Sequence, residues 1–129
     1  MVDPDGTPLT LAIVDDDPFI RAALGRLISS YGYDALLFDG AEALLADRSG
    51  RDPVCVLADL QMPGMGGVEL IRRLAERSPT LPVIAMTAYP NDAIRRRALE
   101  SGAAAYLTKP FDASQLETCL LTLGLRPNS

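Results

Sequence analysis

The chain contains no histidine, and only two of its 129 residues are cysteine. The lack of histidine excludes a histidine nucleophile, a histidine general base and the usual zinc sites. Two cysteines, Cys55 and Cys119, are too few for a disulfide framework. We interpret both as small core residues of a protein in a reducing compartment.

Basic residues are also scarce, since 12 Lys and Arg stand against 17 Asp and Glu and give a net charge of -5. This balance argues against nucleic-acid binding by this domain alone, because phosphate contacts need a basic surface. No apolar run approaches the ~20 residues of a membrane span. There is no basic-then-apolar leader at the amino terminus. We therefore expect a cytoplasmic protein that does not bind membranes.

The length fits one domain, given a prior of roughly 100–200 residues per domain. We predict a disordered tail over residues 1–8, a folded domain over residues 9–124, and a tail or the start of a linker over residues 125–129. The sequence has no internal repeat and no low-complexity segment.

Short apolar runs alternate with segments of helical periodicity along the folded part. The runs predict strands at residues 9–14, 33–38, 54–58, 81–86 and 103–107. Helices are predicted after Asp17, after Gly40, from Gly67, after Asn91 or Asp92, and after Asp112 or Ser114. Such alternation is typical of an α/β fold, with a parallel sheet of five strands and five helices on both of its faces.

Unusual polar residues stand at the carboxyl ends of four predicted strands. They are Asp15 and Asp16, Asp59, Thr87, and Lys109. In a parallel sheet these ends share one edge, which is where open α/β sheets place their ligands. We therefore expect the five side chains to converge.

Clustered carboxylates repel one another, by roughly 4 kcal/mol for a pair about 4 Å apart at an effective dielectric constant near 20. A divalent cation relieves that repulsion, and oxygen ligands suit Mg²⁺, which also binds phosphate oxygens. An acidic pocket with Mg²⁺, a lysine and a hydroxyl indicates a phosphoryl site. The chain has no GxxxxGK[ST] loop, so a nucleotide is not the expected ligand.

Four motifs resemble the receiver domain of bacterial two-component response regulators. They are VDDDP at 14–18, ADLQMPGMGG at 58–67, VIAMTA at 83–88 and AYLTKPF at 105–111. The resemblance covers residues 9–124 and is closest to receivers of LuxR-type helix-turn-helix regulators. It implies a flavodoxin-like three-layer fold with strand order 2-1-3-4-5. It also implies a phosphorylation-dependent switch that has no enzymatic substrate of its own.

The resemblance assigns a role to each residue of the constellation. Asp59 accepts a phosphoryl group from a partner histidine kinase or phosphotransfer protein. Asp16, Asp59 and the backbone carbonyl of Gln61 bind Mg²⁺, with Asp15 acting mainly through a water. Lys109 pairs with Asp59 and then with the phosphoryl group, and the Lys109-Pro110 bond is expected to be cis.

Signal output is assigned to two further groups by the same resemblance. The Thr87 hydroxyl moves to the phosphoryl group, and Tyr106 rotates inward to fill the space that Thr87 leaves. These movements change the surface formed by the fourth helix, the fifth strand and the fifth helix. A homodimer on phosphorylation and a role in transcription regulation are compatible with this scheme.

Two other functions use a similar site. A Mg²⁺-dependent phosphohydrolase of the haloacid-dehalogenase type also has a nucleophilic Asp at a strand end. It usually carries a second Asp two residues later, where this chain has Gln61, and it needs a cap for which no segment is long enough. A flavin or electron carrier ranks last, because three carboxylates would repel a cofactor phosphate.

Overall fold

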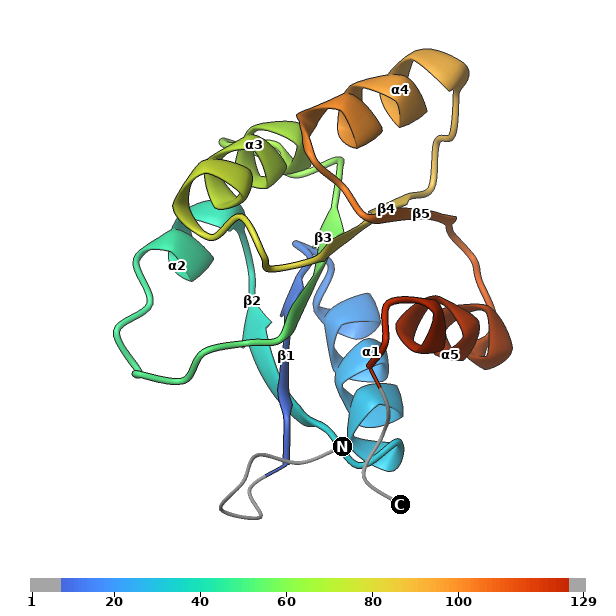
Figure 1. Cartoon of the computed structure of the whole chain (residues 1–129). Helices are drawn as coiled ribbons and strands as arrows, with labels where there is room; N and C mark the ends of the chain where they lie inside the picture. Colours follow the sequence, from blue (N-terminus) through green and yellow to red (C-terminus); the bar gives the residue numbers. More distant parts are fainter. Residues whose placement is uncertain (1–7, 126–129) are drawn as a thin grey trace.

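In the computed structural model, which describes residues 8–125, five strands alternate with five helices (Figure 1). The strands are β1 (Thr10–Val14), β2 (Asp34–Phe38), β3 (Cys55–Asp59), β4 (Val83–Thr87) and β5 (Ala105–Thr108). The helices are α1 (Pro18–Ser30), α2 (Ala41–Leu45), α3 (Gly67–Arg77), α4 (Asp92–Ser101) and α5 (Ala113–Thr122). The predicted alternation is confirmed.

All four strand pairs are parallel, and the strand order is β2-β1-β3-β4-β5, as the resemblance implied. The register aligns the carboxyl ends of neighbouring strands. Asp59 stands opposite Met86, and Thr87 stands opposite Thr108. The last residues of β3, β4 and β5 therefore share one edge of the sheet.

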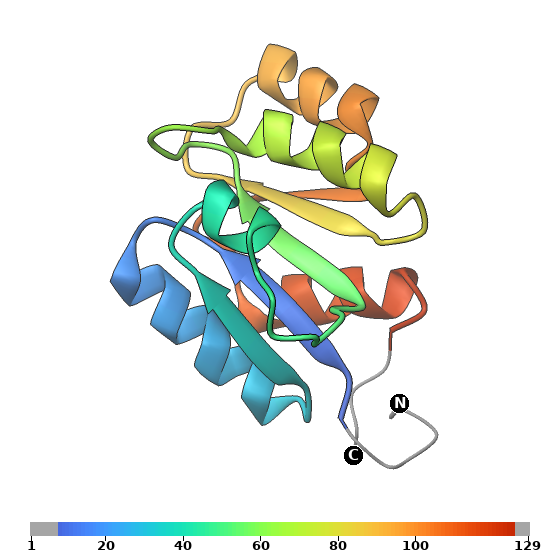
Figure 2. The same cartoon turned by 90° about the vertical axis from the view of Figure 1, so that its left-hand side faces the viewer.

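Helices cover both faces of the sheet, with α1 and α5 on one side and α2, α3 and α4 on the other (Figures 1 and 2). Each layer has its own core. A first core cluster packs Leu24 and Ile28 of α1 and Leu116 of α5 onto the sheet, and a second core cluster includes Leu70 and Ile71 of α3. Every residue of β1, β3 and β4 is buried, as expected for strands that are covered on both faces.

Side-chain caps mark the first residues of α1, α4 and α5. The Asp17 carboxylate accepts the N–H groups of Phe19 and Ile20 at the start of α1, as predicted. Of the alternatives left open by the sequence, Asn91 caps α4 and Asp112 caps α5. These caps matter to the site because they fix the loops that follow β1, β4 and β5.

Strand boundaries differ from the prediction by one or two residues. The fourth strand begins at Val83 rather than residue 81, because Pro82 has no N–H to donate to a ladder. Residues 1–7 and 126–129 of the predicted tails lie outside the described residues. Leu125, the last of the described residues, packs against the first core cluster. No helix within residues 8–125 is long and apolar enough to cross a membrane.

Candidate functional site

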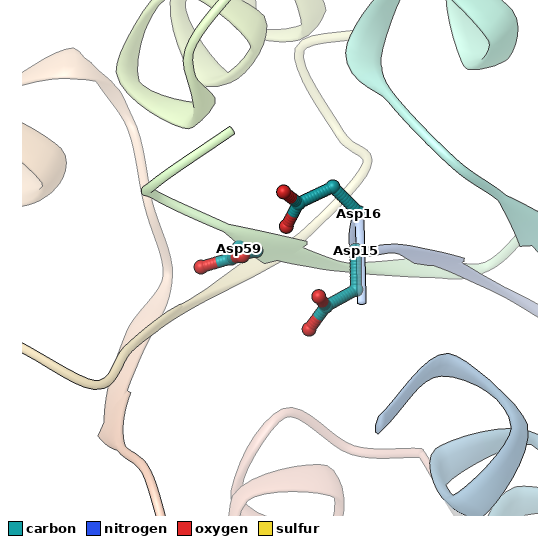
Figure 3. Close-up of side chains that lie close together, drawn as sticks. All are labelled: Asp15, Asp16 and Asp59. Atoms are coloured by element: carbon teal, nitrogen blue, oxygen red, sulfur yellow. The ribbon is translucent and has the colours of Figure 1, made fainter. Parts of the chain in front are cut away.

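Three carboxylates gather at the carboxyl ends of β1 and β3 (Figure 3). Asp15, Asp16 and Asp59 each offer an oxygen, and these oxygens lie within 4.8 Å of one another. Asp15 and Asp59 are buried, whereas Asp16 is exposed. The three acids therefore lie close together, as predicted, and Asp16 is the one that is exposed to solvent.

Asp15 is fully enclosed and both of its carboxylate oxygens are engaged. One accepts the N–H of Asp17 at 3.0 Å, and the other accepts a hydrogen bond from Lys109 Nζ at 2.7 Å. The Arg21 guanidinium donates to the backbone carbonyl of Asp15 at 2.7 Å. This anchoring leaves Asp15 less free than Asp16 to take a new ligand.

Asp59 is the last residue of β3, and only 4% of its surface is exposed. Its Oδ1 accepts the N–H of Gln61 at 3.2 Å and lies 3.6 Å from Lys109 Nζ. Burial raises the pKa of the Asp59 carboxyl to about 6; Lys109 and the Gln61 N–H lower that pKa, while Asp15 and Asp16 raise it. The effect of burial on this pKa is larger than the opposite effect of Lys109.

Lys109 stands beyond the end of β5, and its side chain is 11% exposed. Its backbone N–H donates to the Thr87 carbonyl at 2.7 Å, and the Lys109-Pro110 bond is cis, as the resemblance implied. Lys109 was predicted to pair with Asp59. In the structure Lys109 Nζ lies 3.6 Å from Asp59 Oδ1, and its closer partner is Asp15 Oδ2 at 2.7 Å.

Thr87 ends β4 and is fully buried. Its hydroxyl donates to Gln61 Oε1 at 2.6 Å and accepts the N–H of Tyr89 at 3.0 Å. Tyr106 on β5 is half-buried against the second core cluster, and its hydroxyl is enclosed with no hydrogen-bond partner in the described part of the chain. The two predicted switch residues therefore lie on neighbouring strands.

Some contacts of the site were not predicted. Glu42 on α2 accepts the N–H of Met65 at 3.3 Å and so holds the loop between β3 and α3. The Gln61 side chain accepts a hydrogen bond from Thr87, a contact that was not predicted. The sole sequence signal was the position of Gln61, two residues after Asp59.

Comparison with known proteins agrees with this geometry. Residues 11–121 match the response regulator receiver domain. The chain belongs to this family. The receiver domain is 33% identical over 114 residues to the transcriptional regulatory protein FixJ of Bradyrhizobium diazoefficiens, covering 88% of this chain and 55% of FixJ.

Two further relatives support the same assignment. The chain is 38% identical over 103 residues to the DNA-binding transcriptional regulator NtrC of Salmonella typhimurium, covering 80% of this chain and 22% of NtrC. A CheY-like receiver domain of Methanospirillum hungatei has a TM-score of 0.84 at 27% identity, covering 92% of this chain and 95% of that one. The chain thus spans about half of FixJ and about a fifth of NtrC.

Family membership confirms the predicted class of function. The receiver domain is a phosphorylation-dependent switch of two-component systems, and receiver domains are phosphorylated by histidine kinases. Domains of this family are generally not enzymes. They bind Mg²⁺ at an acidic aspartate cluster, and residues 15, 16 and 59 form such a cluster here.

The raised pKa of Asp59 predicts a pH effect on the stability of the metal-free receiver domain. Burial in the folded state raises the pKa of the Asp59 carboxyl from its ordinary 3.8 to about 6, so the folded state binds more protons than the unfolded state between these values. The free energy of unfolding should therefore fall as pH rises from about 4 to about 6, by at most about 3 kcal/mol from this group.

Denaturant unfolding in the presence of a chelator measures this effect. The Asp59→Asn variant has no such titration, so its stability relative to the wild type should grow over the same pH range. If the difference in the free energy of unfolding between the two proteins is constant from pH 4 to pH 7, the prediction is wrong.

Proposed function

We propose that Asp59 is the phosphoacceptor of this receiver domain. The observation that carries the proposal is a nearly buried carboxylate at the carboxyl end of β3, with Lys109 3.6 Å away and two further acids beside it. A carboxylate oxygen of Asp59 attacks the phosphorus of a phosphohistidine, and the bond from phosphorus to the imidazole nitrogen breaks as the acyl phosphate forms. The donor histidine belongs to a partner kinase or phosphotransfer protein, because this chain has no histidine.

The acidic cluster fits Mg²⁺. Its donors are all oxygens, which Mg²⁺ prefers, and the exposed Asp16 leaves room for the waters that Mg²⁺ keeps. We assign Asp16, Asp59 and the Gln61 carbonyl as direct ligands and Asp15 as a ligand through water, which agrees with the engagement of both Asp15 oxygens. When bound, Mg²⁺ offsets the charge of the carboxylates and of the incoming phosphoryl oxygens.

Lys109 supplies the second positive charge. Its ammonium group lies between Asp15 and Asp59, at 2.7 Å and 3.6 Å. It stabilises the negative charge on the transferred phosphoryl group, and the low exposure of its side chain strengthens that interaction.

Thr87 and Tyr106 couple the phosphoryl group to the surface. The Thr87 hydroxyl donates a hydrogen bond to a phosphoryl oxygen, and Tyr106 adjusts its packing on the adjoining strand β5. The surface of α4, β5 and α5 changes as a result, and this surface serves for homodimer formation on phosphorylation.

The output we propose is transcription regulation. FixJ and NtrC are named as transcription regulators, and this chain covers 55% and 22% of their lengths. A LuxR-type helix-turn-helix domain is the proposed output. The receiver domain itself promotes only its own phosphorylation and dephosphorylation, and no observation favours the phosphohydrolase alternative.

Titration with beryllofluoride and Mg²⁺ tests the proposed function. The phosphoryl mimic should change the fluorescence of the four tyrosines, which are undisturbed by tryptophan because the chain has none. It should also promote dimer formation. Multiple turnover of a phosphomonoester without such a response would instead indicate a hydrolase.

Magnesium should stabilise the folded receiver domain. At a Mg²⁺ concentration a hundredfold above the dissociation constant the gain is about 2.7 kcal/mol, which corresponds to a rise in melting temperature of the order of 10 °C. The rise in melting temperature on addition of Mg²⁺ is measured by calorimetry for the wild type, Asp16→Asn and Asp39→Asn. The shift should shrink in Asp16→Asn and persist in Asp39→Asn, whose exposed carboxylate lies outside the cluster. Equal shifts of the melting temperature in all three proteins would show that Asp16 does not bind the metal.

A further inference from the structure

The hydroxyl of Thr87 has a single proton, and it donates this proton in a hydrogen bond to the side chain of Gln61. Thr87 Oγ1 lies 2.6 Å from Gln61 Oε1, and it also accepts the N–H of Tyr89 at 3.0 Å. Because Thr87 is fully buried, no water competes for this proton. The hydroxyl is therefore committed to Gln61 before any phosphoryl group arrives.

This commitment conflicts with the switching role of Thr87. A phosphoryl oxygen accepts hydrogen bonds only, so it needs the same proton that Gln61 Oε1 accepts. The two bonds exclude each other, and phosphorylation has to break the first to form the second. Gln61 is half-buried, so its released amide can bond to water, whereas the buried hydroxyl always needs a protein partner.

Gln61 is also tied to the phosphoacceptor. Its backbone N–H donates to Asp59 Oδ1 at 3.2 Å, while its side chain reaches across to β4. One residue thus bridges the carboxylate that receives the phosphoryl group and the hydroxyl that responds to it.

We propose that the Gln61 side chain is a latch, a positioning residue that holds Thr87 in its unphosphorylated arrangement and raises the threshold for switching. This inference rests on the proposed role of Thr87 as the group that bonds the phosphoryl oxygen. It assigns to the Gln61 side chain a function separate from that of its backbone carbonyl at the metal.

Replacing Gln61 by methionine removes the amide and preserves the length of the side chain. The hydroxyl proton then has no acceptor in the free protein, so the free state becomes less stable and the bound state does not. A net hydrogen bond of this kind corresponds to about a fivefold change in an equilibrium constant. Gln61→Met should therefore tighten beryllofluoride binding in Mg²⁺ about fivefold.

A double-mutant cycle separates the latch from a general structural effect of Gln61. Beryllofluoride affinity, followed by tyrosine fluorescence, is measured for Gln61→Met alone, in a Thr87→Val background, and in a Thr108→Val background. Thr108 is the matched control because it stands opposite Thr87 in the register but is exposed. The fivefold gain should vanish in Thr87→Val and persist in Thr108→Val.

Each outcome decides the question. Weaker or unchanged binding by Gln61→Met, or an equal gain in the Thr87→Val background, overturns the latch while the wild type still binds the mimic. If the wild type does not bind beryllofluoride at all, the proposed function fails and the latch fails with it.

Discussion

Asp59→Asn should abolish phosphorylation of this receiver domain. An amide is not a nucleophile toward phosphorus, and the variant also loses one of the proposed anionic ligands of Mg²⁺. Incubation with acetyl phosphate and Mg²⁺ should add one phosphoryl group to the wild type and none to the variant, as measured by intact mass. The tyrosine fluorescence response to beryllofluoride should disappear as well.

Asp39→Asn is the matched control for this experiment. Asp39 also follows a strand of the sheet, but it is exposed and lies outside the carboxylate cluster. The control should be phosphorylated as fully as the wild type. Phosphoryl incorporation into Asp59→Asn at the wild-type level would place the acceptor on another residue and overturn the site assignment.

Gly67→Ala, at the first residue of α3, should destabilise the domain more than a methyl group added at the preceding Gly66. A Cβ at Gly67 would lie 2.3 Å from the Asp59 carbonyl oxygen and 2.8 Å from the Leu60 Cα. Both are backbone atoms, so neither can rotate away. Overpacking of this kind costs about 1–3 kcal/mol or more, and here the displaced backbone belongs to Asp59, the proposed phosphoacceptor. We expect lower stability and slower phosphorylation together.

Gly66→Ala is the neighbouring control. Its Cβ would meet only the Leu60 carbonyl oxygen at 3.8 Å, an ordinary contact, so the cost should stay near the ~1 kcal/mol typical of a poorer helix cap. Urea unfolding and acetyl phosphate kinetics of the two variants measure the difference. Equal stabilities for the two would show that the close approach of Gly67 to β3 does not constrain the loop.

The fold could be predicted because the signals for its strands and helices lie in residues that are adjacent in sequence. The buried run that ends in Asp59 and the cap at Asp17 each depend on residues adjacent in sequence. The convergence of the acids, Thr87 and Lys109 then follows from topology, since parallel strands present their carboxyl ends on one edge.

The partners within the site were less predictable. Lys109 lies closer to Asp15 than to Asp59, Gln61 bonds to Thr87, and Glu42 holds the N–H of Met65. These pairs are separated by 94, 26 and 23 residues. The geometry of these pairs depends on how the strands pack and on which oxygen is buried more deeply. Neither property can be predicted from residues that are adjacent in sequence.

The pairing of Lys109 with Asp15 has a consequence for the protein during its synthesis. Asp15 leaves the ribosome early, whereas Lys109 follows Asp59 by fifty residues and reaches the site only when β5 joins the edge of the sheet. A nascent chain therefore contains the proposed acceptor, Asp59, before it contains the lysine that lies between Asp15 and Asp59. Among the described side chains of the site Lys109 is the last to be added, so we expect a chain that ends before β5 to lack a complete site.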